Sequence, residues 1–337
     1  MGSSGLSRRR LLGGLIAAPI VVTLHGCSSD GAGSGTTEGT SPGSDTPGTS
    51  AGSTTTGPAG TTAATVAPAS GWASGGTELI TVDFPATSIF ATAATCTVSL
   101  TQGTTEGPCY FQADTSDDIS LGKTGLPMQL CLQLVDEACT PLADHTVEVW
   151  NCDTRGIYSG DTSASDDASR FAGSFCTDDD AESLKSTYLR GQATTDADGR
   201  VNFKTIFPGW YRGRTIHIHF AVSDPDGTTR VISQWCYPDA LTEEICTTLD
   251  LYADRGVQDT TLASGTDTVF PADYEPFVLS TQANGDGTML SYGVIQIDPT
   301  AVATEASSQG GQPGGGGGGG QPPGGGGGQP PGGGSRP

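Results

Sequence analysis

Short segments in which apolar and polar residues alternate dominate the middle of the chain. Alternation with a period of two places successive side chains on opposite faces of a strand, so each segment predicts a half-buried β-strand. The pattern occurs at residues 129–136, 146–151, 201–206, 216–222, 231–235 and 293–297. Long helical periodicity is missing, and the best helix candidate is a short one at residues 239–249.

Turn residues separate several of these predicted strands. Residues 196–199 (Asp-Ala-Asp-Gly) and 224–227 (Asp-Pro-Asp-Gly) have compositions typical of tight turns. Strands joined in this way predict an all-β fold, and we expect an antiparallel β-sandwich core with long loops. The longest loop, residues 159–187, is acidic but lacks the Asp-x-Asp-x-Asp-Gly spacing of a calcium site, so we expect it to be solvated.

The two ends of the chain have compositions that cannot form a core. Of the 48 residues at positions 28–75, 43 are Ser, Thr, Gly, Ala or Pro, and residues 309–337 contain 17 Gly and 6 Pro. Such segments bury too little apolar surface to offset the entropy of ordering the chain. We therefore predict a linker at 28–75, a folded β-sandwich domain at 76–308 and a disordered Gly/Pro/Gln-rich tail at 309–337.

Residues 1–27 resemble a bacterial export signal. Three arginines at positions 8–10 precede an apolar run of 14 residues that contains a proline and is short for a membrane span. The paired arginines favour the Tat export route over the ordinary Sec route. The sequence Leu24-His25-Gly26-Cys27 resembles a lipoprotein cleavage box. We expect an exported protein, either lipid-anchored through Cys27 to the outer face of the bacterial membrane or extracellular.

The charge balance narrows the range of partners. The chain has 37 acidic and 15 basic residues, which gives a formal net charge of −22. Such a chain repels phosphate backbones and has no basic patch for anionic lipid. We therefore expect no nucleic-acid partner, and membrane contact only through the lipid on Cys27.

The cysteines fit an exported protein. Nine are present, and removing the lipidated Cys27 leaves eight, an even number that indicates disulfides outside the cytoplasm. No Cys-x-x-Cys spacing occurs, which disfavours a zinc ribbon. The sequence leaves the pairing open; the pairs we would choose are Cys139 with Cys152 and Cys236 with Cys246.

The candidate chemistry lies between residues 158 and 234. His217 and His219 are one residue apart in a predicted strand, so both imidazoles face the same side and can reach one point. Such a pair is a moderate signal for a metal, and two surface histidines are the alternative. Tyr211 lies six residues upstream of His217, and Tyr158 follows the predicted strand at 146–151.

Taken together, these motifs resemble the intradiol ring-cleavage dioxygenases, the catechol and protocatechuate family. The most specific part is Pro-Gly-Trp-Tyr-x-Gly-Arg-x-x-His-x-His at residues 208–219. Thr-Glu-Gly-Pro at 105–108, Leu-Arg-Gly at 189–191 and the turn at 196–199 also match, in consistent order.

The resemblance implies a mononuclear non-haem Fe(III) with four ligands, namely Tyr158, Tyr211, His217 and His219. Fe(III) is a hard cation that prefers anionic oxygen, which two phenolates supply, and imidazole also suits iron. The implied reaction uses O2 to open the ring of a catechol-type substrate between its two hydroxylated carbons. The product would be a muconate-type diacid.

The same resemblance implies three catalytic residues. Tyr211 would accept a substrate proton as general base, and Arg214 would stabilise negative charge on the activated ring. Gln234 matches a polar residue of the substrate pocket. Cys109 departs from the family pattern, in which we expect an aromatic residue, and this leaves the shape of the pocket open.

Two other functions remain as alternatives. The chain could be a binding module that kept the β-sandwich and lost the chemistry, or a different metal protein with copper or zinc at His217 and His219. All four implied ligands are present, which weakens the first alternative, and the two tyrosines favour iron over the second. The identity of the substrate and the oligomeric state are left open.

Overall fold

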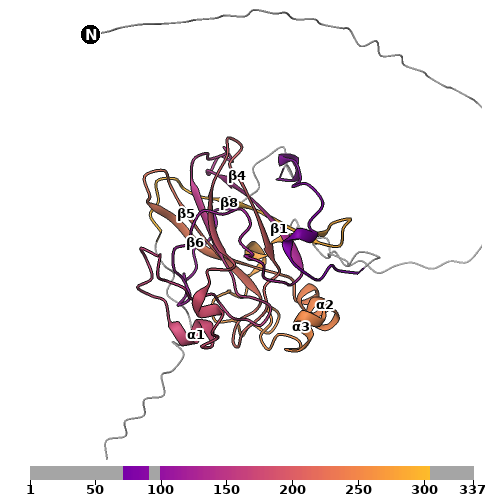
Figure 1. Cartoon of the computed structure of the whole chain (residues 1–337). Coiled ribbons are helices and arrows are strands. Elements are labelled where there is room, and N and C mark those ends of the chain that lie inside the picture. The colour runs from indigo at the N-terminus through magenta and orange to yellow at the C-terminus, as the bar shows by residue number, and fades with distance from the viewer. Residues whose placement is uncertain (1–70, 91–98, 304–337) are drawn as a thin grey trace, which may run out of the picture. The chain divides into compact units, whose positions relative to one another are not determined.

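A computed structural model describes residues 71–90 and 99–303 of this chain (Figure 1). The strands in these residues are β1 (Pro127–Val135), β2 (Thr146–Trp150), β3 (Arg190–Thr194), β4 (Arg200–Ile206), β5 (His217–Ser223), β6 (Thr229–Cys236), β7 (Ser280–Ala283) and β8 (Met289–Gln296). The α-helices are α1 (Gly173–Thr177), α2 (Asp239–Thr248) and α3 (Asp250–Ala253). Short 3-10 helices span Thr77–Leu79, Thr87–Phe90, Ser183–Lys185 and Glu275–Phe277.

The strands form two sheets of four. One sheet has the order β4-β1-β8-β7 and the other the order β3-β2-β5-β6. Every pair in the second sheet is antiparallel, as expected. In the first sheet β1 and β8 run parallel, with Met128 opposite Met289, so this pair departs from the antiparallel expectation. Parallel neighbours need a long connection, and here all the elements from β2 to β7 lie between the two strands.

The inner faces of both sheets share one hydrophobic core. Leu130, Leu132 and Leu134 of β1 lie in the same cluster as Ile218 and Phe220 of β5. The alternation of apolar and polar residues in the sequence therefore predicted the strands correctly, because one face of each sheet packs against the other sheet. The all-β sandwich is confirmed.

The predicted elements match the structure where the alternation is strong. The six predicted strands correspond to β1, β2, β4, β5, β6 and β8, and the predicted helix at 239–249 corresponds to α2. Strands β3 (Arg-Gly-Gln-Ala-Thr) and β7 (Ser-Thr-Gln-Ala) were not predicted. Both are short, polar edge strands of their sheets, so tertiary pairing rather than a hydrophobic pattern defines them.

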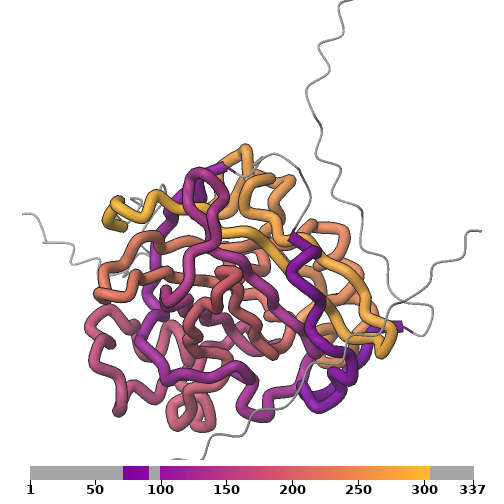
Figure 2. Tube along the Cα trace, turned by 90° about the horizontal axis from the view of Figure 1, so that it is seen from above, coloured from indigo at the N-terminus to yellow at the C-terminus, as the bar shows by residue number. Residues whose placement is uncertain are grey.

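The first described residues run beside the last strands (Figure 2). The amide of Ala73 donates to the carbonyl of Gly287 at 2.8 Å, and Trp72 belongs to the main core cluster. Residues 71–75 thus pack against the fold although their composition is that of the predicted linker. Residues 1–27, with Cys27, and residues 28–70 and 309–337 lie outside the described residues. None of the helices in the described part of the chain is long and apolar enough to cross a membrane.

The disulfides differ from the pairs chosen from the sequence. Cys109 is bonded to Cys176, and Cys139 is also disulfide-bonded, whereas Cys152, Cys236 and Cys246 are free and buried. Both chosen pairs are therefore wrong. Proximity in the sequence is a poor guide, because Cys109 and Cys176 are 67 residues apart and meet only through the folding of two loops.

The acidic loop at 159–187, which we expected to be solvated, contains regular structure and buried side chains. It contains α1, and the Cys109–Cys176 bond ties this helix to the loop around residue 109. The side chains of Ser159, Thr177 and Ser183 are fully buried. The loop is thus anchored to the domain at several points.

We predict that the Cys109–Cys176 bond contributes strongly to stability. A cross-link that closes a loop of this length removes unfolded-state entropy worth about 4 kcal/mol in the chain-entropy description. The variant Cys109→Ala/Cys176→Ala should therefore lose roughly that free energy of unfolding in guanidinium titrations. Cys246→Ala, which removes a buried free thiol without opening a loop, serves as the control. Equal losses in the two variants would show that the cross-link does not stabilise the fold.

Candidate active site

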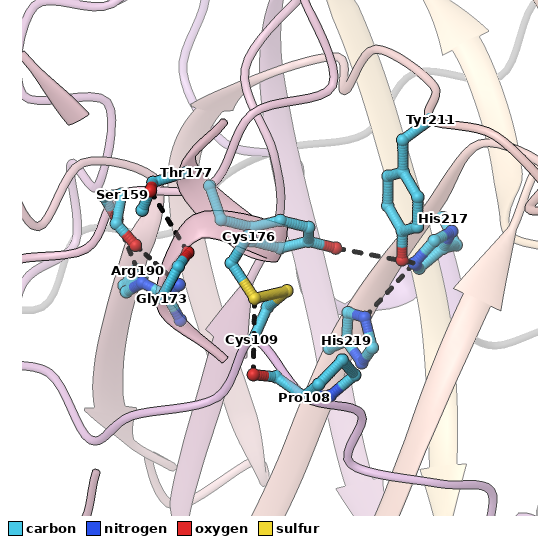
Figure 3. The surroundings of a disulfide bond; sticks show 11 residues. Pro108, Cys109, Ser159, Gly173, Cys176, Thr177, Arg190, Tyr211, His217 and His219 are labelled. Carbon is cyan, nitrogen blue, oxygen red and sulfur yellow. Dashed lines mark hydrogen bonds between the residues drawn. A yellow bond between two sulfur atoms is a disulfide. The ribbon is translucent and has the colours of Figure 1, made fainter. Parts of the chain in front are cut away.

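The two histidines lie on the outer face of the second sheet. Ile218 and Phe220 of β5 point into the core, so His217 and His219 point away from it, as the alternation predicts. Both imidazoles are nonetheless buried, each with 2% of its surface exposed. The loop around residue 109 and the loop at 159–187 cover this face. Figure 3 shows the Cys109–Cys176 bond beside the two rings.

Two tyrosines complete the cluster. Tyr158 lies in the loop after β2, where its amide donates to the carbonyl of Cys176 at 2.8 Å. Tyr211 lies in the connection between β4 and β5. The Nε2 atom of His217 is 3.0 Å from the Tyr211 hydroxyl and 3.1 Å from Nε2 of His219 (Figure 3). It is also 3.5 Å from the Tyr158 hydroxyl. The structure therefore brings together all four residues that the sequence singled out as ligands.

The protonation of His217 follows from its second nitrogen. Its Nδ1 atom lies 2.6 Å from the carbonyl oxygen of Thr215, so Nδ1 carries the proton and donates it. Nε2 then keeps its lone pair and faces the other three polar atoms. Burial, and secondarily Arg214, lowers the pKa of His217 to about 3, and burial lowers that of His219 well below its ordinary value. Both rings are neutral at physiological pH.

The position of His219 depends on packing rather than on a hydrogen bond. Its Nδ1 atom is buried without a partner among the described residues. Instead, the indole of Trp150 stacks on the ring, with centroids 5.0 Å apart and planes 13° from parallel. On another side lies Gly107, which has a φ of +80°; a Cβ atom there would come within 3.3 Å of His219 Cε1. Glycine in the Thr-Glu-Gly-Pro segment thus allows the loop to approach the ring.

Arg214 and Gln234 form a pair beside the cluster. Nη2 of Arg214 donates to Oε1 of Gln234 at 2.6 Å, and Nε2 of Gln234 donates to the carbonyl of Thr105 at 2.7 Å. Gln234 lies opposite His219 in the register of β5 and β6 and is fully buried. Burial raises the pKa of Tyr211, and the guanidinium of Arg214 opposes this rise. Arg214 is therefore close enough to favour negative charge in the cluster.

The donor set fits a hard cation. Among the described residues no group of three His, Cys, Asp or Glu side chains is placed to hold a metal, so a metal here needs other donors. The four side chains offer two phenol oxygens and two imidazole nitrogens that converge on one point. Without a cation, burial raises the pKa of Tyr158 well above its ordinary value. A bound cation reverses this preference and favours phenolate, and phenolate and imidazole together suit iron.

Two polar contacts of the site were not predicted from the sequence. Asp267 accepts a hydrogen bond from Arg214 Nε, and Glu148 accepts one from the hydroxyl of Tyr110 at 3.1 Å. Glu148 is on the outer face of β2, two residues from Trp150. Asp267 lies in a loop with no regular pattern, and no sequence signal would have identified it. Glu148 could have been noticed as a charged residue in an otherwise apolar strand.

Residues 105–249 match the protein family described as Dioxygenase. The chain is also similar to a solved intradiol ring-cleavage dioxygenase from Tetranychus urticae, with 25% identity over 60% of this chain and 97% of that chain and a TM-score of 0.50. A second solved dioxygenase has 24% identity over 60% of this chain and 96% of its own, also with a TM-score of 0.50. A 3-chlorocatechol 1,2-dioxygenase from Rhodococcus opacus 1CP has 17% identity over 58% and 71% of the two chains, with a TM-score of 0.40. No curated protein matches the chain significantly.

We predict a pH-dependent stability that is due to Glu148. Burial raises its pKa from the ordinary 4.5 to about 7, although hydrogen bonds from Tyr110 and Ala113 lower it. Below about pH 4.5 the carboxyl is protonated in both folded and unfolded chains. Between pH 4.5 and 7 the unfolded chain releases this proton first, so the free energy of unfolding falls as pH rises, by roughly 3 kcal/mol in total.

Glu148→Gln removes the titrating group and should flatten this part of the profile. The measurement is denaturant unfolding of both proteins at pH 5 and pH 8. The stability of the variant relative to the original protein should rise between these values. A difference that stays constant with pH would contradict the assignment.

Proposed function

We propose that this chain, whose residues 105–249 match the dioxygenase family, is an intradiol ring-cleavage dioxygenase that cleaves a catechol-type ring between its two hydroxylated carbons. Both atoms of O2 are incorporated, so a catechol becomes a muconate-type diacid with no other product. The observation that supports this proposal most is the convergence of Tyr158, Tyr211 and His219 on Nε2 of His217.

We assign the four residues of this cluster, Tyr158, Tyr211, His217 and His219, as ligands of a non-haem Fe(III). When bound, Fe(III) would draw electron density from a catecholate and make its ring reactive towards O2. The hydrogen bond from His217 Nδ1 to Thr215 fixes the tautomer that leaves Nε2 available. The stack of Trp150 on His219 fixes the plane of the second imidazole.

Tyr211 is the residue we assign to proton transfer. A catechol must lose the protons of its two hydroxyls, and a phenolate oxygen in the cluster is a base within reach of them. Tyr211 is the better candidate because it is only partly buried, whereas Tyr158 is 1% exposed. Arg214, which opposes the effect of burial on the pKa of Tyr211, makes the phenolate state easier to reach.

Arg214 is assigned to charge stabilisation and Gln234 to holding it. A ring that has lost both protons carries negative charge, and a buried guanidinium stabilises such charge more strongly than one in water. Arg214 is 8% exposed. The carboxamide of Gln234 joins its guanidinium to the backbone of Thr105, on the loop that also carries Gly107. Gln234 therefore links Arg214 to the loop that carries Thr105 and Gly107.

The reaction is tested by the product. Iron-loaded protein incubated with catechol under ¹⁸O2 should consume one O2 per ring and give a diacid that contains both labelled atoms. A ring-opened product without label, or cleavage beside rather than between the hydroxyls, would contradict the proposal. Binding of catechol without O2 uptake would favour the inactive binding module, and activity that requires copper or zinc would favour the second alternative.

The ligand assignment predicts a loss of iron on removal of one phenol. Tyr158→Phe removes an anionic donor and should lower the bound iron per chain at least tenfold at limiting metal. Tyr188→Phe is the matched control, since Tyr188 is another buried tyrosine, directly after the loop at 159–187, and its hydroxyl contacts Ser183 and the carbonyl of Ile157 rather than the cluster. Metal analysis after gel filtration measures both. Equal iron content in the two variants would remove Tyr158 from the ligand set.

The role of Arg214 predicts slow turnover with intact iron. Arg214→Ala should retain the metal and lose about 100-fold in kcat, the size seen when one preorganised donor to a developing charge is removed. Arg230→Ala is the control, because Arg230 pairs with Asp224 on the same sheet, in the β5–β6 hairpin. Steady-state rates and metal content are measured on the same samples. Unchanged turnover in Arg214→Ala would show that the assigned role is wrong.

We also propose that the protein acts outside the cytoplasm. The support is the sequence of residues 1–27, with its arginines and Cys27, together with a disulfide between Cys109 and Cys176. A lipid on Cys27 would hold the domain at the outer face of the membrane through the linker. The substrate would then be a catechol-type compound present outside the cell.

A further inference from the structure

Asp267 lies next to the proposed active site and outside the part of the chain that matches the dioxygenase family, residues 105–249. Its side chain is 3% exposed. Its two carboxylate oxygens accept hydrogen bonds from Nε of Arg214, at 3.2 and 3.1 Å. Oδ2 also accepts the amide of Thr215 at 2.8 Å. A carboxylate from the loop before β7 thus reaches both the side chain of Arg214 and the backbone next to it.

The hydrogen bonds of Arg214 show what this contact leaves free. Nε is used by Asp267 and Nη2 by Gln234, while Nη1 makes no hydrogen bond to any residue that the structure describes. Two of the three nitrogens of the guanidinium are therefore used to hold it. The third remains for a ligand, and the charge of the group acts on Tyr158 and Tyr211.

The carboxylate is itself held rigidly. The amides of Val269 and Phe270 donate to its Oδ1 at 2.8 and 2.9 Å, and the ring of Phe270 lies 5.5 Å from the guanidinium carbon of Arg214. Burial would raise the pKa of Asp267, but Arg214 and these backbone groups lower it below 3.8. Asp267 is therefore ionised at physiological pH and pairs with Arg214 as a fixed charge.

We propose that Asp267 is a positioning residue of the reaction, which together with Gln234 fixes the guanidinium of Arg214 so that Nη1 faces the substrate. This inference rests on the proposed function. Asp267 touches neither the substrate nor the four ligands, and the effect proposed here is the one that it exerts on the reaction through Arg214. A planar guanidinium held at Nε and Nη2 has one orientation left, and preorganisation of this kind is what makes a charge effective in catalysis.

The kinetic test is a double-mutant cycle in iron-loaded protein. Asp267→Asn keeps the shape of the side chain and removes the charge that holds Arg214. It should lower kcat by 10-fold or more with little change in KM and in bound iron. In an Arg214→Ala background the same substitution should change kcat less than twofold, because the group that it positions is gone. Asp224→Asn is the matched control, since Asp224 also pairs with an arginine and caps a turn.

Asp267→Glu is a second, more conservative variant, which keeps the test valid if Asp267→Asn does not fold. It keeps the charge but moves it by one methylene, so it should fold and bind iron as the original protein does. With Arg214 present, its kcat should fall by less than that of Asp267→Asn. Combined with Arg214→Ala, it should restore none of the activity lost in Arg214→Ala. A purely structural Asp267 would give losses that add in the two backgrounds.

A second readout does not depend on activity. In metal-free protein labelled with ¹⁵N-arginine, the Nε–H signal of Arg214, identified by its loss in Arg214→Lys, should exchange slowly with water. In Asp267→Asn its exchange should be at least 10-fold faster. An unchanged exchange rate, or additive losses of kcat in the cycle, would overturn the inference. If the original protein has no dioxygenase activity, the proposed function fails, while the exchange rate still decides whether Asp267 holds Arg214.

Discussion

The alternation of β5 is the constraint on which the site depends. Ile218 and Phe220 belong to the core between the sheets, and this fixes His217 and His219 on the opposite face. A shift of register by one residue would exchange the two sets, burying imidazoles in the core and exposing apolar side chains. Because the core strongly resists such a shift, the separation and direction of the two histidines are set by the same packing that stabilises the domain.

The other members of the site come from loops that the sandwich holds in place. Tyr158, Tyr211 and Arg214 lie in connections between strands. The amide of Tyr158 donates to the carbonyl of Cys176, and the amide of Arg214 donates to the carbonyl of Tyr211. The Cys109–Cys176 bond joins the two loops that cover the histidines. Burial disfavours the charged forms of these side chains, as the raised pKa of Tyr158 and the lowered pKa of His217 indicate. A bound cation would favour the phenolate forms of the tyrosines and use the lone pairs of the neutral histidines, so the same environment would bind a metal.

The sequence was sufficient to predict the strands with strong alternation, the sandwich and the grouping of the four candidate ligands. The histidines were predictable because they are neighbours on one strand. Tyr158 and Tyr211 needed the family resemblance, since nothing local brings residues 53 positions apart together. Strand β3, the Cys109–Cys176 bond and the contact of Asp267 with Arg214 were not predictable. Each is defined by long-range contacts of segments with no periodic pattern, and the parallel pairing of β1 with β8 is of the same kind.

The most direct test of the central claim is the visible spectrum of purified protein loaded with Fe(III), recorded before and after catechol is added without O2. Phenolate ligands at Tyr158 and Tyr211 predict a charge-transfer band that colours the protein red-brown, and catechol should shift that band. A colourless protein that takes up no iron, or an iron form whose spectrum catechol leaves unchanged, would contradict the assignment of this cluster as the active site.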